Sequence, residues 1–73
     1  MKYWALFKDP KAEKKEITKE QARDCLTDYW KPEYLADLFD NNKEFRLWTS
    51  FYDVWTENDN GMVPAPGFYG EVG

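Results

Sequence analysis

The sequence predicts a small, helix-rich α+β domain with a short N-terminal strand, three packed helices and an extended C-terminal tail. Apolar residues recur at helical spacing in 19–30 and 32–40, and polar residues recur at steps of three and four in 42–57. Prolines and glycines accumulate in 61–73 and interrupt regular structure there. With 73 residues we expect one domain, 1–73, that buries roughly 60% of the surface of its unfolded chain.

Residues 1–8 have the composition of a strand that is covered on both faces, and a helix is the alternative. The two sides of the strand would carry Tyr3, Ala5 and Phe7 and, opposite them, Trp4 and Leu6. A strand needs a neighbour for its backbone groups, which either the tail near 68–72 or the same strand of a second molecule would provide. Asp9 and Pro10 would then open a short helical turn or a lysine-rich loop over 11–16.

Two helices with clear start signals follow. Thr18 and Gln21 match a capping box, which predicts a helix over 19–30. Pro32 ends that helix and opens a second one over 32–40, because proline suits the first helical position. The apolar sides of the two helices carry Ala22, Cys25, Leu26, Tyr29 and Trp30, and then Tyr34, Leu35, Leu38 and Phe39.

The segment 42–57 can be interpreted in two ways. Its Phe, Trp, Tyr, Val and Thr residues favour a strand, but the polar spacing draws one continuous stripe on a helix, and we predict the helix. Asn41 and Glu44 match a capping box, and Gly61 would terminate the pattern. The predicted core comprises Leu26, Tyr29, Leu35, Leu38, Phe39, Trp48, Phe51, Tyr52 and Trp55.

The residue inventory argues against catalysis. The chain has no His, no glycine-rich phosphate loop, no nucleophile elbow and no cysteine pair, so we predict neither an enzyme, nor a cofactor, nor a metal site. A lone Cys25 cannot form an internal disulfide, and no apolar stretch has the length of a signal peptide or a membrane span. We therefore expect a cytoplasmic protein with no membrane partner, in which Cys25 is buried as a small apolar residue.

The charges are distributed unevenly along the chain, with net +2 in 1–31 (eight basic, six acidic) and net −6 in 32–73 (two basic, eight acidic). The overall charge of −4 argues against nucleic acid as the main partner. Carboxylates recur on one side of 32–40, at Glu33, Asp37 and Asp40. Such a row resembles a phosphate backbone in its charge, so an inhibitor that occupies the basic groove of a nucleic-acid-handling enzyme is one hypothesis.

These observations predict a non-enzymatic protein-binding module, and one form of this prediction is a small acidic inhibitor or accessory protein of the phage or mobile-element type. Aromatic residues make up 19% of the chain, more than a small core can enclose, so we expect some on a contact surface. The tail 61–73 either docks into a partner or, as we prefer, folds back on its own domain. The predicted binding residues are Trp48, Tyr52, Trp55, Glu33, Asp37, Asp40, Phe68 and Tyr69.

Two alternative functions remain. The first is a small nucleic-acid-binding protein that uses the lysine-rich segment 8–23, although acidic residues interrupt that segment. The second is a homo-oligomeric structural protein that assembles through the N-terminal strand.

Overall fold

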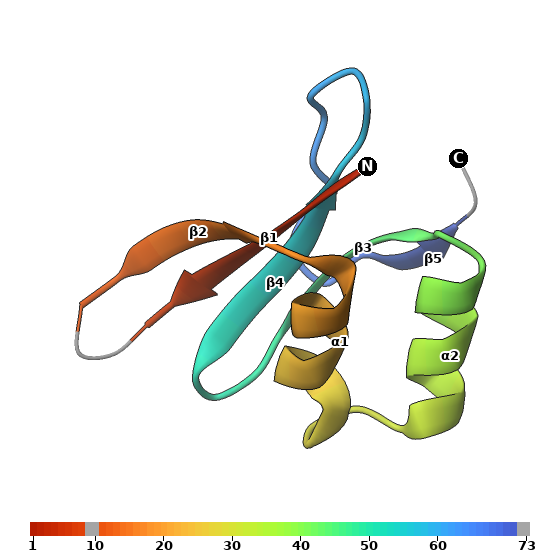
Figure 1. Ribbon diagram of the computed structural model, residues 1–73, viewed down its shortest axis with the longest axis horizontal. Helices are drawn as coiled ribbons and strands as arrows, with labels where there is room; N and C mark the ends of the chain where they lie inside the picture. Colours follow the sequence, from red (N-terminus) through yellow and green to blue (C-terminus); the bar gives the residue numbers. More distant parts are fainter. Residues whose placement is uncertain (9–10, 72–73) are drawn as a thin grey trace.

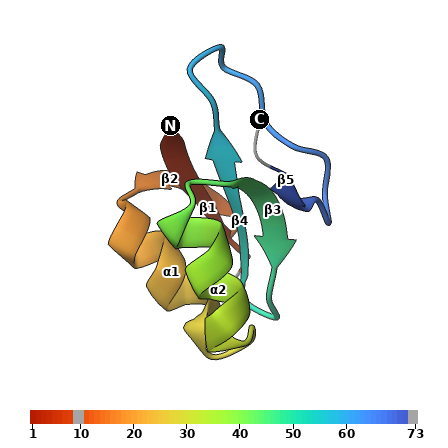
Figure 2. The same ribbon diagram turned by 90° about the vertical axis from the view of Figure 1, so that its right-hand side faces the viewer.

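The computed structural model describes residues 1–8 and 11–71, in which two helices cover one face of a five-stranded antiparallel sheet (Figures 1 and 2). The predicted α-rich fold with three helices is therefore wrong. In chain order the elements are β1 (Lys2–Phe7), β2 (Glu13–Ile17), α1 (Lys19–Thr27), α2 (Pro32–Asp40), β3 (Glu44–Trp48), β4 (Tyr52–Glu57) and β5 (Tyr69–Glu71).

Strand β1 is confirmed as a strand, and its neighbours differ from those we expected. The sheet order is β2-β1-β4-β3-β5, so β1 lies between β2 and β4 and pairs with both along its length. Neither the tail nor a second molecule is needed to pair its backbone. This position places β1 and β4 in the interior of the sheet, where each strand has a hydrogen-bonded neighbour on both sides.

The lysine-rich segment after the first turn forms a strand, where we expected a helical turn or a loop. Residues Glu13–Ile17 pair with β1 in register from Phe7↔Glu13 to Tyr3↔Ile17. The proposed opening of that turn at Asp9 and Pro10 lies outside the described residues. Strand β2 forms an edge of the sheet, and its charged side chains are exposed, which discourages pairing with further strands.

Both predicted helices in 19–40 are present. The Thr18 side chain accepts from the Gln21 N–H, and the Gln21 side chain accepts from the Thr18 N–H, so the predicted capping box is confirmed. Helix α1 ends at Thr27, three residues earlier than predicted, and Tyr29 and Trp30 lie in the loop before Pro32. Helix α2 has the predicted bounds and buries Leu35, Leu38 and Phe39.

The segment 42–57, predicted as a helix, forms a β-hairpin. Asn41 and Asn42 end α2 and do not start a new helix. Asn42 has a φ of 50°, the left-handed conformation that stops a helix. The N–H groups of Asn42 and Lys43 then donate to the carbonyls of Phe39 and Leu38 at 3.4 and 2.9 Å, in the pattern of a Schellman motif. The chain leaves α2 in a new direction and enters β3.

The polar spacing that favoured a helix in this segment has a different origin for each residue. Thr49 and Ser50 lie in the turn, and Arg46 lies over the Trp55 ring at 5.1 Å from its centroid. Thr56 is fully buried and exchanges hydrogen bonds with the Phe45 backbone, at 3.1 and 3.4 Å. Alternation of Phe45 and Leu47 with exposed or partly exposed neighbours was the correct signal.

The core lies between the helices and the inner face of the sheet. Tyr3 stacks on Phe39 at 5.9 Å and lies beside Phe45 at 6.3 Å, which joins β1, α2 and β3. The buried apolar residues are Tyr3, Ala5, Ala22, Leu26, Leu35, Leu38, Phe39, Phe45, Leu47, Val54 and Trp55. Of the predicted core, Tyr29, Trp48 and Phe51 are instead exposed.

Within the described residues, no helix lies over the opposite face of the sheet (Figure 2), and two cationic side chains lie over indole rings there. Trp4 and Trp55 are paired across β1 and β4 on this face. Lys14 Nζ lies 4.5 Å from the Trp4 ring centroid, and Arg46 covers Trp55 from the other side. Trp55, which lies between neighbouring strands under Arg46, is 6% exposed.

The tail folds back, as we preferred. The N–H of Gly67 donates to the Arg46 carbonyl at 3.0 Å, and the N–H of Arg46 donates to the Phe68 carbonyl at 2.6 Å. Beyond this point the chain forms β5 beside β3. The prediction of an extended tail over 61–73 is thus not met, because a turn at 66–67 leads into β5, and residues 72–73 lie outside the described part of the chain.

Replacing the buried Thr56 with Val should lower the free energy of unfolding by about 1–3 kcal/mol, because the Phe45 backbone groups would stay buried without the hydroxyl. Urea unfolding followed by circular dichroism measures the change. The matched control is Thr27→Val at an exposed position, for which we expect a change within about 0.5 kcal/mol. Equal stability of Thr56→Val and the native chain would contradict the bridging role of Thr56.

Candidate functional site

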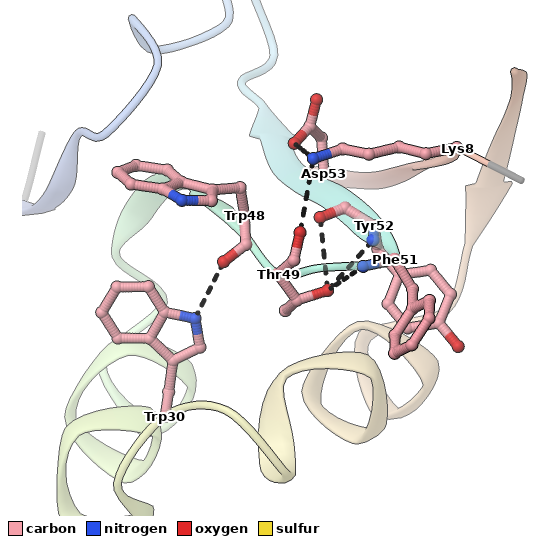
Figure 3. A network of polar contacts seen from close by, with 7 residues as sticks. All are labelled: Lys8, Trp30, Trp48, Thr49, Phe51, Tyr52 and Asp53. Carbon is pink, nitrogen blue, oxygen red and sulfur yellow. Dashed lines mark hydrogen bonds and ion pairs between the residues drawn. The ribbon is translucent and has the colours of Figure 1, made fainter.

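The β3–β4 turn is organised around the side chain of Thr49 (Figure 3). Its hydroxyl oxygen accepts from the N–H groups of Phe51 and Tyr52, at 3.2 and 3.0 Å. The Thr49 N–H donates to the Tyr52 carbonyl at 2.7 Å and closes the turn. Because Thr49 is 5% exposed, water competes little for these bonds, and the turn holds one shape.

Three further contacts, made by two side chains, attach this turn to the rest of the molecule (Figure 3). Lys8 Nζ donates to the Thr49 carbonyl at 3.3 Å and forms an ion pair with Asp53 at 3.2 Å, which connects the turn to the end of β1. On the other side, the indole N–H of Trp30 donates to the Trp48 carbonyl at 3.3 Å. The α1–α2 loop and the β3–β4 turn are therefore fixed side by side.

Aromatic side chains gather where these two loops meet. We call this surface the aromatic end, and it comprises Phe7, Tyr29, Trp30, Tyr34, Trp48, Phe51 and Tyr52. One series of ring contacts runs from Phe7 to Tyr52, Phe51 and Tyr29, with centroids 5.2 to 6.3 Å apart. A second runs from Tyr34 to Trp30 and Trp48, at 5.6 and 6.5 Å.

Three side chains of the aromatic end are exposed to solvent. The exposed fractions of Tyr29, Trp48 and Phe51 are 45%, 54% and 55%. An open hollow of about 350 Å³ lies beside them and is lined by Tyr29, Trp30, Lys31 and Tyr34. Of the three, the rings of Tyr29 and Phe51 are in contact, and Trp48 contacts Trp30 of the same α1–α2 loop. Exposed large apolar groups at hydrogen-bonded loops are typical of a contact surface.

The predicted aromatic binding residues have three different environments. Trp48 is exposed at the aromatic end, and Tyr52 is half-buried there against Phe7. Trp55 belongs to the opposite face of the sheet and is buried. The structure therefore places the rings of Trp48 and Tyr52 apart, on either side of the β3–β4 turn (Figure 3), and separates both from Trp55.

The predicted acidic residues are exposed on α2, and two of the three already have cationic partners. Lys43 Nζ lies 2.7 Å from Asp37 Oδ2, and Arg23 lies 3.6 Å from Asp40. The hydrogen bond from Lys43 is the main reason why the pKa of Asp37 lies below its ordinary value. Glu33, at the start of α2, has no ion pair within the described residues, and it neighbours Tyr34 of the aromatic end.

The predicted tail residues lie away from this end. Phe68 is half-buried, and it lines a hollow of about 240 Å³ with Met62, Val63 and Pro64. Tyr69 belongs to β5, and its side chain lies outside the described part of the structure. The tail contributes to the neighbourhood of Trp48 through Gly67, whose backbone lies against the indole ring.

The sequence prediction missed Tyr29, Trp30, Tyr34 and Phe51 as surface residues. A usable signal was present, because α1 has to end before Pro32, which places Tyr29 and Trp30 in a loop and removes them from the helix face. Phe51 could not be identified in this way, since its exposure follows from the hairpin that the helix prediction excluded.

The described residues offer little for metal or thiol chemistry. In 1–8 and 11–71, no three His, Cys, Asp or Glu side chains come together as metal ligands would. Cys25 is half-buried against the core, and burial raises the pKa of its thiol, with a further increase from the Asp24 carboxylate. The thiol therefore stays protonated at neutral pH and is a poor nucleophile.

Comparison with protein-family models, with curated proteins and with solved structures finds no match to this chain. Within the described residues, neither helix has the length and apolar character that crossing a membrane requires. The assignment of the site therefore depends on its geometry.

Replacing Trp55 or Trp48 with Ala should have different effects on stability, because the first indole is buried and the second is exposed. We expect Trp55→Ala to reduce the free energy of unfolding by about 3–5 kcal/mol, because it leaves a cavity under Arg46. Trp48→Ala should cost at most about 1 kcal/mol, since most of its surface is already in water. Urea unfolding of both variants measures the difference, and equal losses would contradict the placement of Trp48 at the surface.

Proposed function

We propose that this chain is a non-enzymatic protein-binding module that contacts its partner through the aromatic end. The observation that carries the proposal is the joint exposure of Tyr29, Trp48 and Phe51 on two loops that hydrogen bonds hold together. Side chains of this kind supply a large contact area and lose little conformational entropy on binding, because neighbouring rings already restrict them.

The acidic side of α2 fits this proposal as a flank of the interface. The exposed carboxylates of Glu33, Asp37 and Asp40 would repel an acidic partner and attract a basic one, which affects the rate of association more than the final affinity. Because Asp37 and Asp40 have cationic partners within the chain, the row is a weaker imitation of a phosphate backbone than the sequence suggests. The partner in this proposal can still be a nucleic-acid-handling enzyme that the chain inhibits. In that case the aromatic end, and not the acidic row, would supply most of the affinity.

The two alternative functions have less geometric support. Lysines of the 8–23 segment are engaged within the chain: Lys8 with Asp53, Lys15 with Glu13, and Lys14 with the Trp4 ring. They are therefore less available to phosphate groups. Assembly through β1 would have to displace β2 or β4. We also propose a cytoplasmic location, since the single cysteine forms no internal disulfide.

The test compares partner capture by three forms of the chain. The double variant Tyr29→Ser with Phe51→Ser removes exposed rings of the aromatic end, and Met62→Ser, at a residue 65% exposed, is the matched control elsewhere. Proteins captured from lysate of the source by the native chain are identified, and their affinities for all three forms are measured. We expect the double variant to bind at least about tenfold more weakly and the control to bind like the native chain.

Circular dichroism should show that all three forms are folded, because the replaced side chains lie at the surface. Unchanged affinity of the double variant for every captured protein would contradict the proposal.

A further inference from the structure

We propose that the segment bound at the aromatic end is an extended, proline-containing stretch of the partner that also carries Lys or Arg. This inference rests on the proposed function and names the chemistry of the ligand. Three features of the structure carry it: what already packs on Trp48, the geometry of the rings, and the charges beside them.

The chain's own tail shows what kind of segment Trp48 accepts. Pro66 and Gly67 line a hollow of about 140 Å³ together with the Trp48 ring. Gly67 has a φ of 84°, and a Cβ atom there would lie 3.3 Å from Cζ3 of Trp48, closer than an ordinary contact. Trp48 thus packs against a proline–glycine segment by close approach of the backbone, and more than half of the residue remains exposed for a second segment.

The rings of the aromatic end are arranged so that flat faces and edges alternate. Trp30 stacks on Tyr34 with an interplanar angle of 22° and meets Trp48 at 87° (Figure 3 shows the two indoles). The open hollow beside Trp30 and Tyr34 has aromatic walls on which proline rings pack well. A polyproline II segment enters such a surface with its shape preformed, so binding it costs little conformational entropy.

A β-strand of the partner could form few backbone hydrogen bonds at this position. The indole N–H of Trp30 is already bonded to the Trp48 carbonyl. On the outer edge of β3, the N–H and carbonyl of Arg46 are bonded to the tail. A strand would find few free partners, whereas a polyproline II segment forms no backbone ladder and depends on ring contacts. The geometry therefore favours the proline-containing ligand.

The charges at this end favour a basic ligand. Asp28 and Glu33 flank the α1–α2 loop, and within the described residues neither has an ion pair. Lys31 lies between them as a single opposing charge, and Lys8 is neutralised by Asp53. Lys or Arg in the ligand would pair with the two free carboxylates, in a chain whose net charge is −4.

The test uses the indole N–H signals of the four tryptophans in ¹H–¹⁵N NMR spectra. The probe is a short capped peptide with a Pro-X-X-Pro repeat and an arginine at each end, and the control peptide has alanine in place of every proline. We expect the proline peptide to shift the Trp30 and Trp48 signals and to leave those of Trp4 and Trp55 in place. The alanine peptide should bind at least about tenfold more weakly, and glutamate in place of arginine should also weaken binding.

Equal binding of the alanine peptide, or shifts centred on Trp4 and Trp55, would overturn the inference, as would retention of full affinity by Tyr29→Ser. The proposed function is judged separately. If a captured partner depends on Tyr29 and Phe51 but the proline peptide does not displace it, the protein-binding proposal stands and the ligand class is wrong. If no captured protein depends on these residues, the proposed function itself fails.

Discussion

The hydrogen bonds of Thr49 are the constraint on which the rest of this structure depends. They reverse the chain between β3 and β4, so that β4 runs back through the middle of the sheet and pairs with both β1 and β3. Without that reversal β1 would lose one of its two neighbours, and the inner face would lose Val54 and Thr56. The same turn places Trp48 over Trp30, and the aromatic end is therefore a direct consequence of how the sheet is closed.

Sequence reasoning was sufficient where a local signal and the tertiary structure agree. The capping box at Thr18, the proline start of α2 and the apolar pattern of β1 are all local, and each of these elements is confirmed. It failed in 42–57 because helical spacing of polar residues arose from unrelated causes: a turn, a buried hydroxyl and a cation over an indole. It also failed for β2, whose charged sequence becomes a strand only because the exposed edge of β1 needs a partner.

The same difference between local and tertiary signals explains why only part of the candidate site was predicted from the sequence. Trp48 was predicted both as a core residue and as a binding residue, and the structure shows that it is exposed. Its neighbour Trp30 comes from the α1–α2 loop, and no sequence spacing connects that loop to the hairpin. Trp55 was predicted both as a core residue and as a binding residue, and it is buried. Its position beside Arg46, on the face of the sheet away from the helices, depends on a strand register that only the folded sheet defines. A small domain with many aromatic residues buries some under helices and some under cations, and in this chain the remainder is exposed at the aromatic end.

The hairpin is the central claim, and nuclear Overhauser effects across residues 44–57 test it most directly. The structure predicts contacts between backbone protons of the paired residues Arg46↔Trp55, Leu47↔Val54 and Trp48↔Asp53, together with a contact from the Trp30 indole proton to the turn. A continuous series of strong sequential amide contacts with helical spacing through 42–57 would contradict the hairpin. It would also remove the basis for placing Trp48, Phe51 and Tyr29 on one surface.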